Sequence, residues 1–218
     1  MSARAVTGRH AADMDRMYRY QRHIYDLTRK YYLIGRDRMI AGLHAPAGAS
    51  ILEVGCGTGR NLALTRRHYP DAKLYGLDIS QEMLQTASAN LAGGHEPVKL
   101  HVADATTFRA EDFGIDGFDR IMISYAVSMI PAWEDAVTTA LTALNPNGSL
   151  HIVDFGQQER LPALFRHMLQ AWLRRFHVTP RASLREVLQS RVEAANADLT
   201  LEEIGRGYAW LAVIRKRG

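Results

Sequence analysis

A glycine-rich segment directly after a short apolar run is the feature that most limits how this chain can fold. Residues 51–59 read Ile-Leu-Glu-Val-Gly-Cys-Gly-Thr-Gly, with a glycine at every second position of the second half. Glycine allows the backbone to turn sharply and lets a ligand approach where a Cβ would stand in the way. A buried strand that runs through such a turn into a helix is the nucleotide-binding element of parallel α/β sheets.

The spacing of the glycines separates two classes of cofactor. A dinucleotide fingerprint, G-x-G-x-x-G, would need its third glycine at Arg60. The observed G-x-G-x-G, with an acid two residues before it, resembles the first motif of the class I methyltransferases. An acidic neighbourhood also suits a cationic sulfonium better than a pyrophosphate. The resemblance implies S-adenosylmethionine as cofactor and S-adenosylhomocysteine as product, contacted by Glu53, Gly55, Cys56, Gly57 and Gly59.

Apolar runs and helical patterns alternate along the middle of the chain, which predicts a mainly parallel sheet with helices on both faces. We predict strands at 50–54, 73–77, 98–102, 119–124 and 149–153. Helices are expected at 59–68 and 131–144, and a further helix is expected to begin after Ser80 as its N-cap. Two further runs, 199–204 and 208–214, flank Gly-Arg-Gly and predict an antiparallel hairpin at one edge. The expected fold is therefore a seven-stranded, Rossmann-like α/β sheet of the class I methyltransferase type.

Length and periodicity together predict one domain. A chain of 218 residues can bury one sizeable core. Apolar residues recur at helical spacing over 12–43 and again over 161–195. We therefore expect a single methyltransferase domain over 1–218, with an N-terminal helical cap at 1–45 and a helical insertion at 157–196.

Acidic residues follow the second and third predicted strands. In the class I methyltransferases, an acid at the position of Asp78 accepts hydrogen bonds from the ribose, and one at Asp104 accepts from the adenine amino group, while the next backbone N–H, that of Ala105, donates to the ring. The same resemblance implies that Ile79 and Met83 flank the adenine. Asp78 alone would fit a nicotinamide cofactor equally well, and either acid could be only a turn or cap residue.

The end of the fourth predicted strand should lie beside the transferred methyl group. No Asn/Asp-Pro-Pro-Tyr motif follows it, which favours an acceptor such as an aliphatic amine that needs mainly alignment. Ser124 is a further candidate contact to the cofactor. Tyr125 is the candidate catalytic residue, either as acceptor of an ammonium proton or as a ring that holds the cation. Packing at a strand end is the alternative role for this tyrosine.

The Tyr- and Arg-rich stretch 17–38 resembles the start of the bacterial betaine-lipid methyltransferases, and the segments 153–156 and 178–181 are similar too. That resemblance implies trimethylation of the amino group of diacylglyceryl-homoserine. It also implies that the N-terminal helix closes over the cofactor through Tyr25, Tyr32 and Arg36, with Arg36 paired to the cofactor carboxylate. An aromatic stripe that only docks the helix on the core is the alternative.

Charge is unevenly distributed, and this bears on partners. Residues 157–196 hold seven Lys/Arg against three Asp/Glu, whereas 45–156 hold seven against thirteen. Within the basic part, the segment 161–175 combines an apolar stripe with arginines, as in helices that lie at a membrane interface. A helix docked on the sheet would use the same stripe.

We therefore expect a lipid substrate at the inner face of the cytoplasmic membrane, with the protein cytoplasmic and peripheral. It could act with the enzyme that makes diacylglyceryl-homoserine. No metal, no nucleic acid and no transmembrane segment are expected. The open alternatives are methylation of a quinone precursor or of phosphatidylethanolamine, transfer of an aminopropyl or aminocarboxypropyl group, and a non-enzymatic binding module that retains the cofactor fold.

Overall fold

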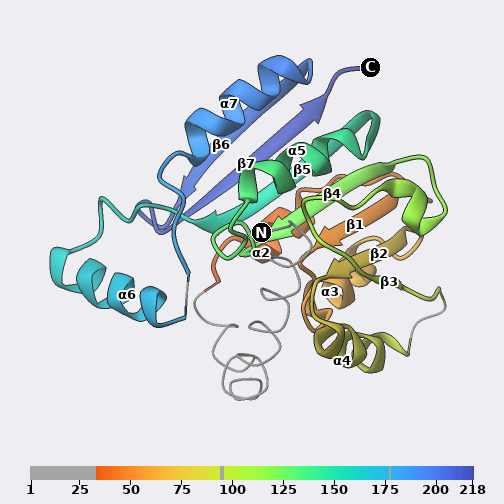
Figure 1. Ribbon diagram of the computed structural model, residues 1–218, viewed down its shortest axis with the longest axis horizontal. Coiled ribbons are helices and arrows are strands. Elements are labelled where there is room, and N and C mark those ends of the chain that lie inside the picture. The colour runs from red at the N-terminus through yellow and green to blue at the C-terminus, as the bar shows by residue number, and fades with distance from the viewer. Residues whose placement is uncertain (1–32, 94–95, 177) are drawn as a thin grey trace, which may run out of the picture.

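The computed structural model describes residues 33–93, 96–176 and 178–218, and its centre is one seven-stranded sheet (Figure 1). The strands lie in the order β3-β2-β1-β4-β5-β7-β6. Their bounds are β1 Ser50–Val54, β2 Lys73–Asp78, β3 Lys99–Val102, β4 Phe118–Ser124, β5 Leu144–Phe155, β6 Ala197–Ile204 and β7 Ala209–Lys216. The predicted fold class is confirmed, including the antiparallel pair at one edge.

Strand pairing places a crevice at the carboxyl ends of β1 and β4. β1 is parallel to both β2 and β4, and β4 is parallel to β5, so that Ser124 lies opposite Val153. β7 is antiparallel to β5 and to β6. The strand order reverses direction between β1 and β4, and such a switch point is where open α/β sheets bind their ligands.

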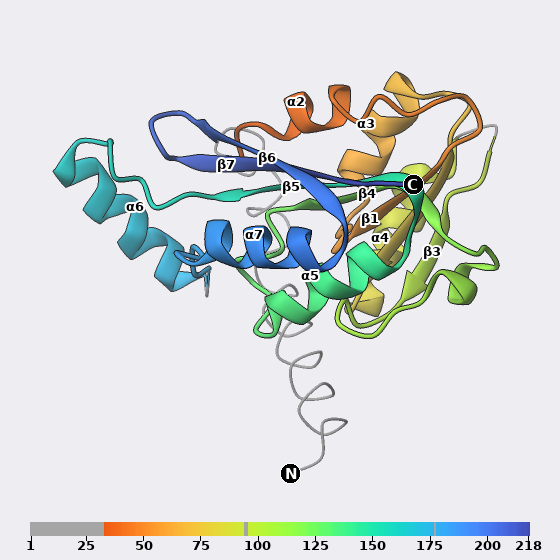
Figure 2. The ribbon, with the colours of Figure 1, turned by 90° about the horizontal axis from the view of Figure 1, so that it is seen from above.

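Helices cover both faces of the sheet (Figure 2). They are α2 Arg36–Ala41, α3 Arg60–His68, α4 Gln81–Leu91, α5 Trp133–Thr142, α6 Ala163–Arg175 and α7 Leu184–Ala194, with a 3₁₀ turn η1 at Ala110–Phe113. α2 and α3 lie on one face, and α5 and α7 lie on the other. α6 projects from the body of the molecule at the end where β5 leaves the sheet (Figure 1).

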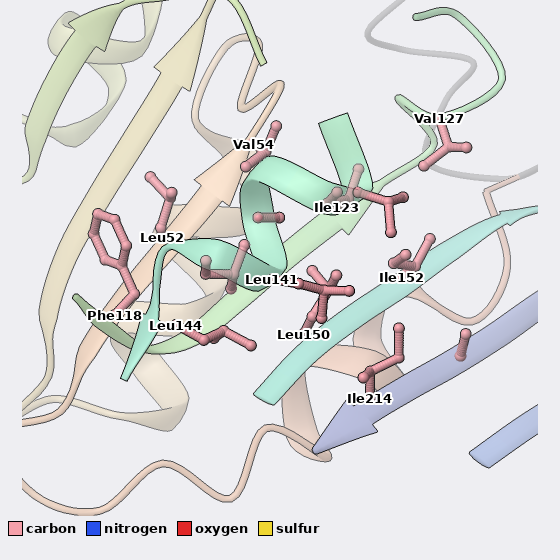
Figure 3. Packing of buried hydrophobic residues seen from close by; sticks show 14 of the residues in the cluster. Leu52, Val54, Phe118, Ile123, Val127, Leu141, Leu144, Leu150, Ile152 and Ile214 are labelled. Carbon is pink, nitrogen blue, oxygen red and sulfur yellow. The ribbon is translucent and has the colours of Figure 1, made fainter. Parts of the chain in front are cut away.

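Alternating strand residues build two apolar layers, one on each face. Leu52 and Ile123 belong to the layer under α5 and α7, which Figure 3 shows closely packed. Ile51 and Met122, their neighbours in sequence, belong to the layer under α2, α3 and α4. All four side chains are fully buried. Because β1 and β4 are covered on both faces, only their carboxyl ends remain open for chemistry.

Three predicted boundaries need correction. The helix predicted for 131–144 ends at Thr142, and β5 begins at Leu144, because the residue before Pro146 is pushed away from helical backbone. The helical pattern of 161–195 is interrupted between α6 and α7, around Pro180. The pattern of 12–43 is broken at Gly35, whose φ of 87° is left-handed; of the rest, residues 12–32 lie outside the described residues.

Within the described ranges, no helix combines the length and the apolar character needed to cross a bilayer.

Candidate active site

The glycine turn between β1 and α3 forms the floor of the crevice. All three glycines have positive φ, namely 70° at Gly55, 53° at Gly57 and 78° at Gly59. A Cβ on Gly55 would lie 2.9 Å from the Ala126 Cβ, and one on Gly59 would lie 2.8 Å from a Leu91 methyl group, whereas a Cβ on Gly57 would meet no atom within 4 Å. The outer two glycines are therefore required by packing, and Gly57 leaves open space.

A buried acid and an amide tie the two sides of this turn together. Asn61 Nδ2 donates a hydrogen bond of 2.7 Å to Glu53 Oε1, and only 1% of Glu53 is exposed. The sequence pattern indicates Glu53 as a site residue but does not indicate Asn61. The available signal was its position in the first turn of the helix that follows the glycines.

Asp78 fixes the turn from the neighbouring strand β2. Its Oδ2 accepts from the Gly57 N–H at 2.9 Å and its Oδ1 from the Ser80 N–H at 3.0 Å. Ser80 is the N-cap of α4, as predicted, and its hydroxyl accepts from the Met83 N–H. Ile79 directly follows β2 and is partly buried, and Met83 is buried in the first turn of α4.

A small cavity opens over the glycine turn and brings several predicted residues together. It is lined by Leu33, Arg36, Glu53, Gly55, Cys56, Gly57, Thr58, Arg60, Asn61 and Ser124. Arg36 is buried, and its Nε donates to the Leu33 carbonyl at 3.2 Å. Burial and the neighbouring carboxylates of Asp78 and Glu53 raise the pKa of the Cys56 thiol, which stays protonated at neutral pH.

Other predicted contacts lie outside the lining of that cavity. Asp104 follows β3 at the same edge of the sheet, and its Oδ1 accepts from the backbone and the hydroxyl of Thr106, at 2.9 and 2.7 Å. It thus has a turn role in the structure, and its role toward adenine, like that of Ala105, stays a prediction. Tyr25 and Tyr32 lie outside the described residues.

Tyr125 lies directly after β4 with a left-handed φ of 54°. The side chain is 2% exposed, packs edge-on against Phe155, and donates its hydroxyl to the Ile34 carbonyl at 2.6 Å. Burial, with Asp154 nearby, raises the pKa of the Tyr125 phenol. The hydroxyl is therefore a hydrogen-bond donor that holds the segment before α2, and service as a proton acceptor would require this bond to break.

The loop after Tyr125 is anchored by a buried acid at the end of β5. Asp154 is 2% exposed and accepts from the Ser128 N–H at 2.9 Å, while burial raises its pKa to about 6. Arg181 donates to the carbonyls of Val127 and Ile130 at 3.2 and 2.7 Å. The segments noted at 153–156 and 178–181 therefore meet around one loop, which the sequence alone could not show.

Two buried polar atoms at this cavity suit a polar ligand. Asn61 Oδ1 and Ser124 Oγ are buried and have no hydrogen-bond partner among the described residues, although both residues line the cavity. Buried polar atoms are almost always paired in native proteins, so a ligand is the natural partner here. Among the residues that the structure describes, no group of His, Cys, Asp and Glu could hold a metal ion.

Comparison with known proteins agrees with this geometry. Residues 51–148 match a family model described as a methyltransferase domain. This part of the chain is similar to a methyltransferase domain. The matched part contains the glycine turn, Asp78 and the whole of β4.

Curated relatives of the methyltransferase domain act on different acceptors. A phosphatidylethanolamine N-methyltransferase of Cereibacter sphaeroides is 33% identical over 129 residues, 58% of this chain and 60% of that protein. A ubiquinone/menaquinone biosynthesis C-methyltransferase of Desulfotalea psychrophila is 27% identical over 60% of this chain and 53% of its own length. The chain thus spans little more than half the length of these two relatives.

Solved structures show the same fold over nearly the whole chain. A putative methyltransferase of Haloferax volcanii, in complex with the Trm112 activator, superposes with a TM-score of 0.73 at 15% identity, covering 94% of this chain and 99% of that one. The plantazolicin methyltransferase BpumL, in complex with S-adenosylhomocysteine, has a TM-score of 0.71 at 13% identity, covering 98% and 99%.

Proposed function

We propose that the protein is an S-adenosylmethionine-dependent N-methyltransferase that trimethylates the homoserine amine of diacylglyceryl-homoserine to form a betaine lipid. The observation that carries the cofactor half of this proposal is the cradle of Glu53, Asn61, Gly57 and Asp78 at the carboxyl ends of β1 and β2. The resemblance of 17–38 to the betaine-lipid methyltransferases supports the acceptor half. The phosphatidylethanolamine N-methyltransferase relative supports a lipid amine as the acceptor class.

S-adenosylmethionine supplies an electrophilic methyl group on a sulfonium, so this chain needs to bind, align and exclude water. Gly57 leaves room for close approach of the ligand to the backbone. Glu53 and Asp78 hold negative charge beside that approach, which favours a cation. The buried guanidinium of Arg36 lines the same cavity and would pair with the cofactor carboxylate.

A lipid acceptor is also supported by the surface of α6. Leu164, Phe165 and Met168 are 76%, 51% and 64% exposed, and they follow one another on one side of the helix. Arg166, Arg174 and Arg175 belong to the same helix, and Arg160 lies just before it. A helix with exposed apolar side chains and flanking cations suits an anionic bilayer surface. We propose on this ground that the protein works peripherally at the inner face of the membrane.

The acceptor is tested by a panel presented in mixed micelles with S-adenosylmethionine. Diacylglyceryl-homoserine, phosphatidylethanolamine and a demethylated quinone are each incubated with the purified protein, and the products are measured by mass spectrometry. The proposal expects gains of one, two and three methyl groups on the homoserine lipid. Methylation of phosphatidylethanolamine or the quinone, with the homoserine lipid unchanged, would replace the proposed acceptor with that of a curated relative.

Two wider roles rest on the same proposal. The substrate must be supplied by a reaction that attaches homoserine to diacylglycerol, and the protein could act together with the enzyme that performs it. Transfer of a 3-amino-3-carboxypropyl group from S-adenosylmethionine is separated from methyl transfer in the same experiment, because its product has a different mass.

A further inference from the structure

A second cavity lies beside the candidate active site, between the loop after β5 and the inner side of α6. Its volume is about 300 Å³, at the lower end of the range for small-molecule sites. Its lining is about half apolar, with Leu173, Val178 and Pro180, and half polar, with Gln157, Gln158, Gln170, Arg174 and Thr179. None of these residues belongs to the cavity over the glycine turn.

The walls of this cavity are fixed to the carboxyl edge of the sheet. The Gln158 N–H donates to the Gly207 carbonyl at 2.9 Å, which ties one wall to the turn before β7. The Thr179 N–H donates to the Ser128 carbonyl at 3.0 Å, and Ser128 is bonded in turn to Asp154. The cavity is therefore joined to the loop after Tyr125, where the acceptor must reach the cofactor.

Two side-chain amides of the lining have polar atoms without a partner. Gln158 is fully buried and donates its Nε2 to the Gly156 carbonyl, but its Oε1 has no hydrogen-bond partner among the described residues. The buried Nε2 of Gln157 likewise has none there. A buried acceptor and a buried donor on adjacent residues predict a ligand, or a water, that offers both kinds of group.

The apolar strip of α6 faces the solvent, whereas Gln170, Leu173 and Arg174 of the same helix line the cavity. Leu164 and Leu173 are nine positions apart, which at 3.6 residues per turn is about two and a half turns and places them on opposite sides of α6. Leu164 is exposed, whereas Leu173 is buried and lines the cavity with Arg174. A lipid held at the outer side of α6 would thus find a cationic, polar cavity behind the helix.

We propose that this cavity is the head-group site, in which Arg174 and the Gln157 amide bind the anionic group of the acceptor head, the carboxylate of homoserine in the proposed substrate. This inference rests on the proposed function for the identity of that anion. Gln158 Oε1 would accept a hydrogen bond from a donor of the same head. Arginine paired with an amide donor is a suitable combination for a carboxylate.

The test is calorimetric binding of water-soluble heads to the full chain in saturating S-adenosylhomocysteine. The probes are glyceryl-homoserine and glycerophosphoethanolamine, which lack the acyl chains. The variant is Arg174→Gln, and Arg175→Gln is the matched control, since it removes a neighbouring exposed arginine that does not line the cavity. We expect Arg174→Gln to weaken glyceryl-homoserine at least tenfold and Arg175→Gln to change it less than twofold, with S-adenosylhomocysteine affinity constant in both.

The outcomes separate this inference from the proposed function. If glycerophosphoethanolamine binds in place of glyceryl-homoserine with the same dependence on Arg174, the cavity is still the head-group site and only the proposed acceptor is replaced. Equal affinity of wild type, Arg174→Gln and Arg175→Gln for a probe that binds would overturn the inference. The absence of binding by both probes would also overturn the inference, and the Gln157 and Gln158 amides would then be hydrogen-bonded to water.

Discussion

Asn61 and Glu53 are joined across the glycine turn by a hydrogen bond of 2.7 Å from Asn61 Nδ2 to Glu53 Oε1. Glu53 is a buried residue of β1, and Asn61 is in the first turn of α3. The bond fixes the acid at the edge of the cavity in which the cofactor is expected. The same bond keeps the Glu53 carboxylate buried and places its negative charge at that cavity.

Replacing the amide with a second carboxylate should weaken cofactor binding. In Asn61→Asp, two like charges would lie side by side in a buried place, so Glu53 must shift or hold a proton. We expect the calorimetric Kd for S-adenosylhomocysteine to rise at least tenfold. Asn145→Asp is the matched control, because Asn145 donates to Asp119 at the amino end of β4. An equal loss of affinity in both variants would show a general loss of stability instead.

The role of Gly57 in cofactor binding can be tested with Gly48 as the control, because Gly48 also has a positive φ but lies outside the expected cofactor site. Gly57 and Gly48 both have positive φ, 53° and 77°, and a Cβ on either would meet no atom within 4 Å. Both Gly→Ala changes should therefore cost about 1 kcal/mol of unfolding free energy. Only Gly57→Ala should also lose S-adenosylhomocysteine affinity, because its methyl would occupy the ligand's path. Unchanged affinity in Gly57→Ala would remove this turn from the binding site.

Tyr125→Phe examines the candidate catalytic residue. The change removes the donor to the Ile34 carbonyl and should cost about 1 kcal/mol of stability. We predict a fall in turnover with little change in S-adenosylhomocysteine affinity, measured as kcat against Kd. A role as proton acceptor predicts in addition that the remaining activity rises with pH more steeply than in the wild type. Wild-type turnover in Tyr125→Phe would end the assignment.

The sequence predicted the sheet well because its strands are short apolar runs with sharp ends. Ser50–Val54 was predicted to the residue, and Asp78, the last residue of β2, does meet the glycine turn. Contacts between distant segments could not be predicted in this way. Asp154 accepts a hydrogen bond from Ser128, and Arg181 donates to the loop after β4 that contains Ser128. These contacts depend on the path of the chain through α6 and α7, and no local sequence pattern encodes that path.

A buried histidine should make the fold sensitive to acid. Burial, with Arg120 nearby, lowers the pKa of His151 from 6.5 to about 3. Between pH 6.5 and about pH 3, His151 binds a proton in the unfolded chain but not in the folded chain. The unfolding free energy therefore falls as pH falls, by at most about 1.4 kcal/mol per pH unit. Asp154 acts in the opposite direction between about 6 and 3.8, because its folded form already holds the proton.

The two effects are separated by urea titrations of wild type and His151→Gln from pH 7 to pH 4. The difference in unfolding free energy between the two proteins should shrink as pH falls, because only the wild type has the imidazole to protonate on unfolding. Curves that stay parallel over this range would show that His151 is protonated to the same extent in both states.

The apolar strip of α6 predicts binding to anionic vesicles. Leu164→Ser combined with Met168→Ser removes exposed apolar area and should reduce sedimentation with phosphatidylglycerol vesicles at least fivefold, with no loss of fold by circular dichroism. Val102→Ser is the control, since Val102 is 51% exposed on β3, away from α6. Equal sedimentation of all three proteins would contradict a role for this helix at the membrane.

The most direct test of the central claim is transfer of a trideuterated methyl group from labelled S-adenosylmethionine to diacylglyceryl-homoserine in vesicles, followed by mass spectrometry of the lipid head. We expect up to three labelled methyl groups on the amine with the wild-type protein, and a strong reduction with Gly57→Ala. Absence of label on the lipid, in a protein that binds S-adenosylhomocysteine normally, would contradict it.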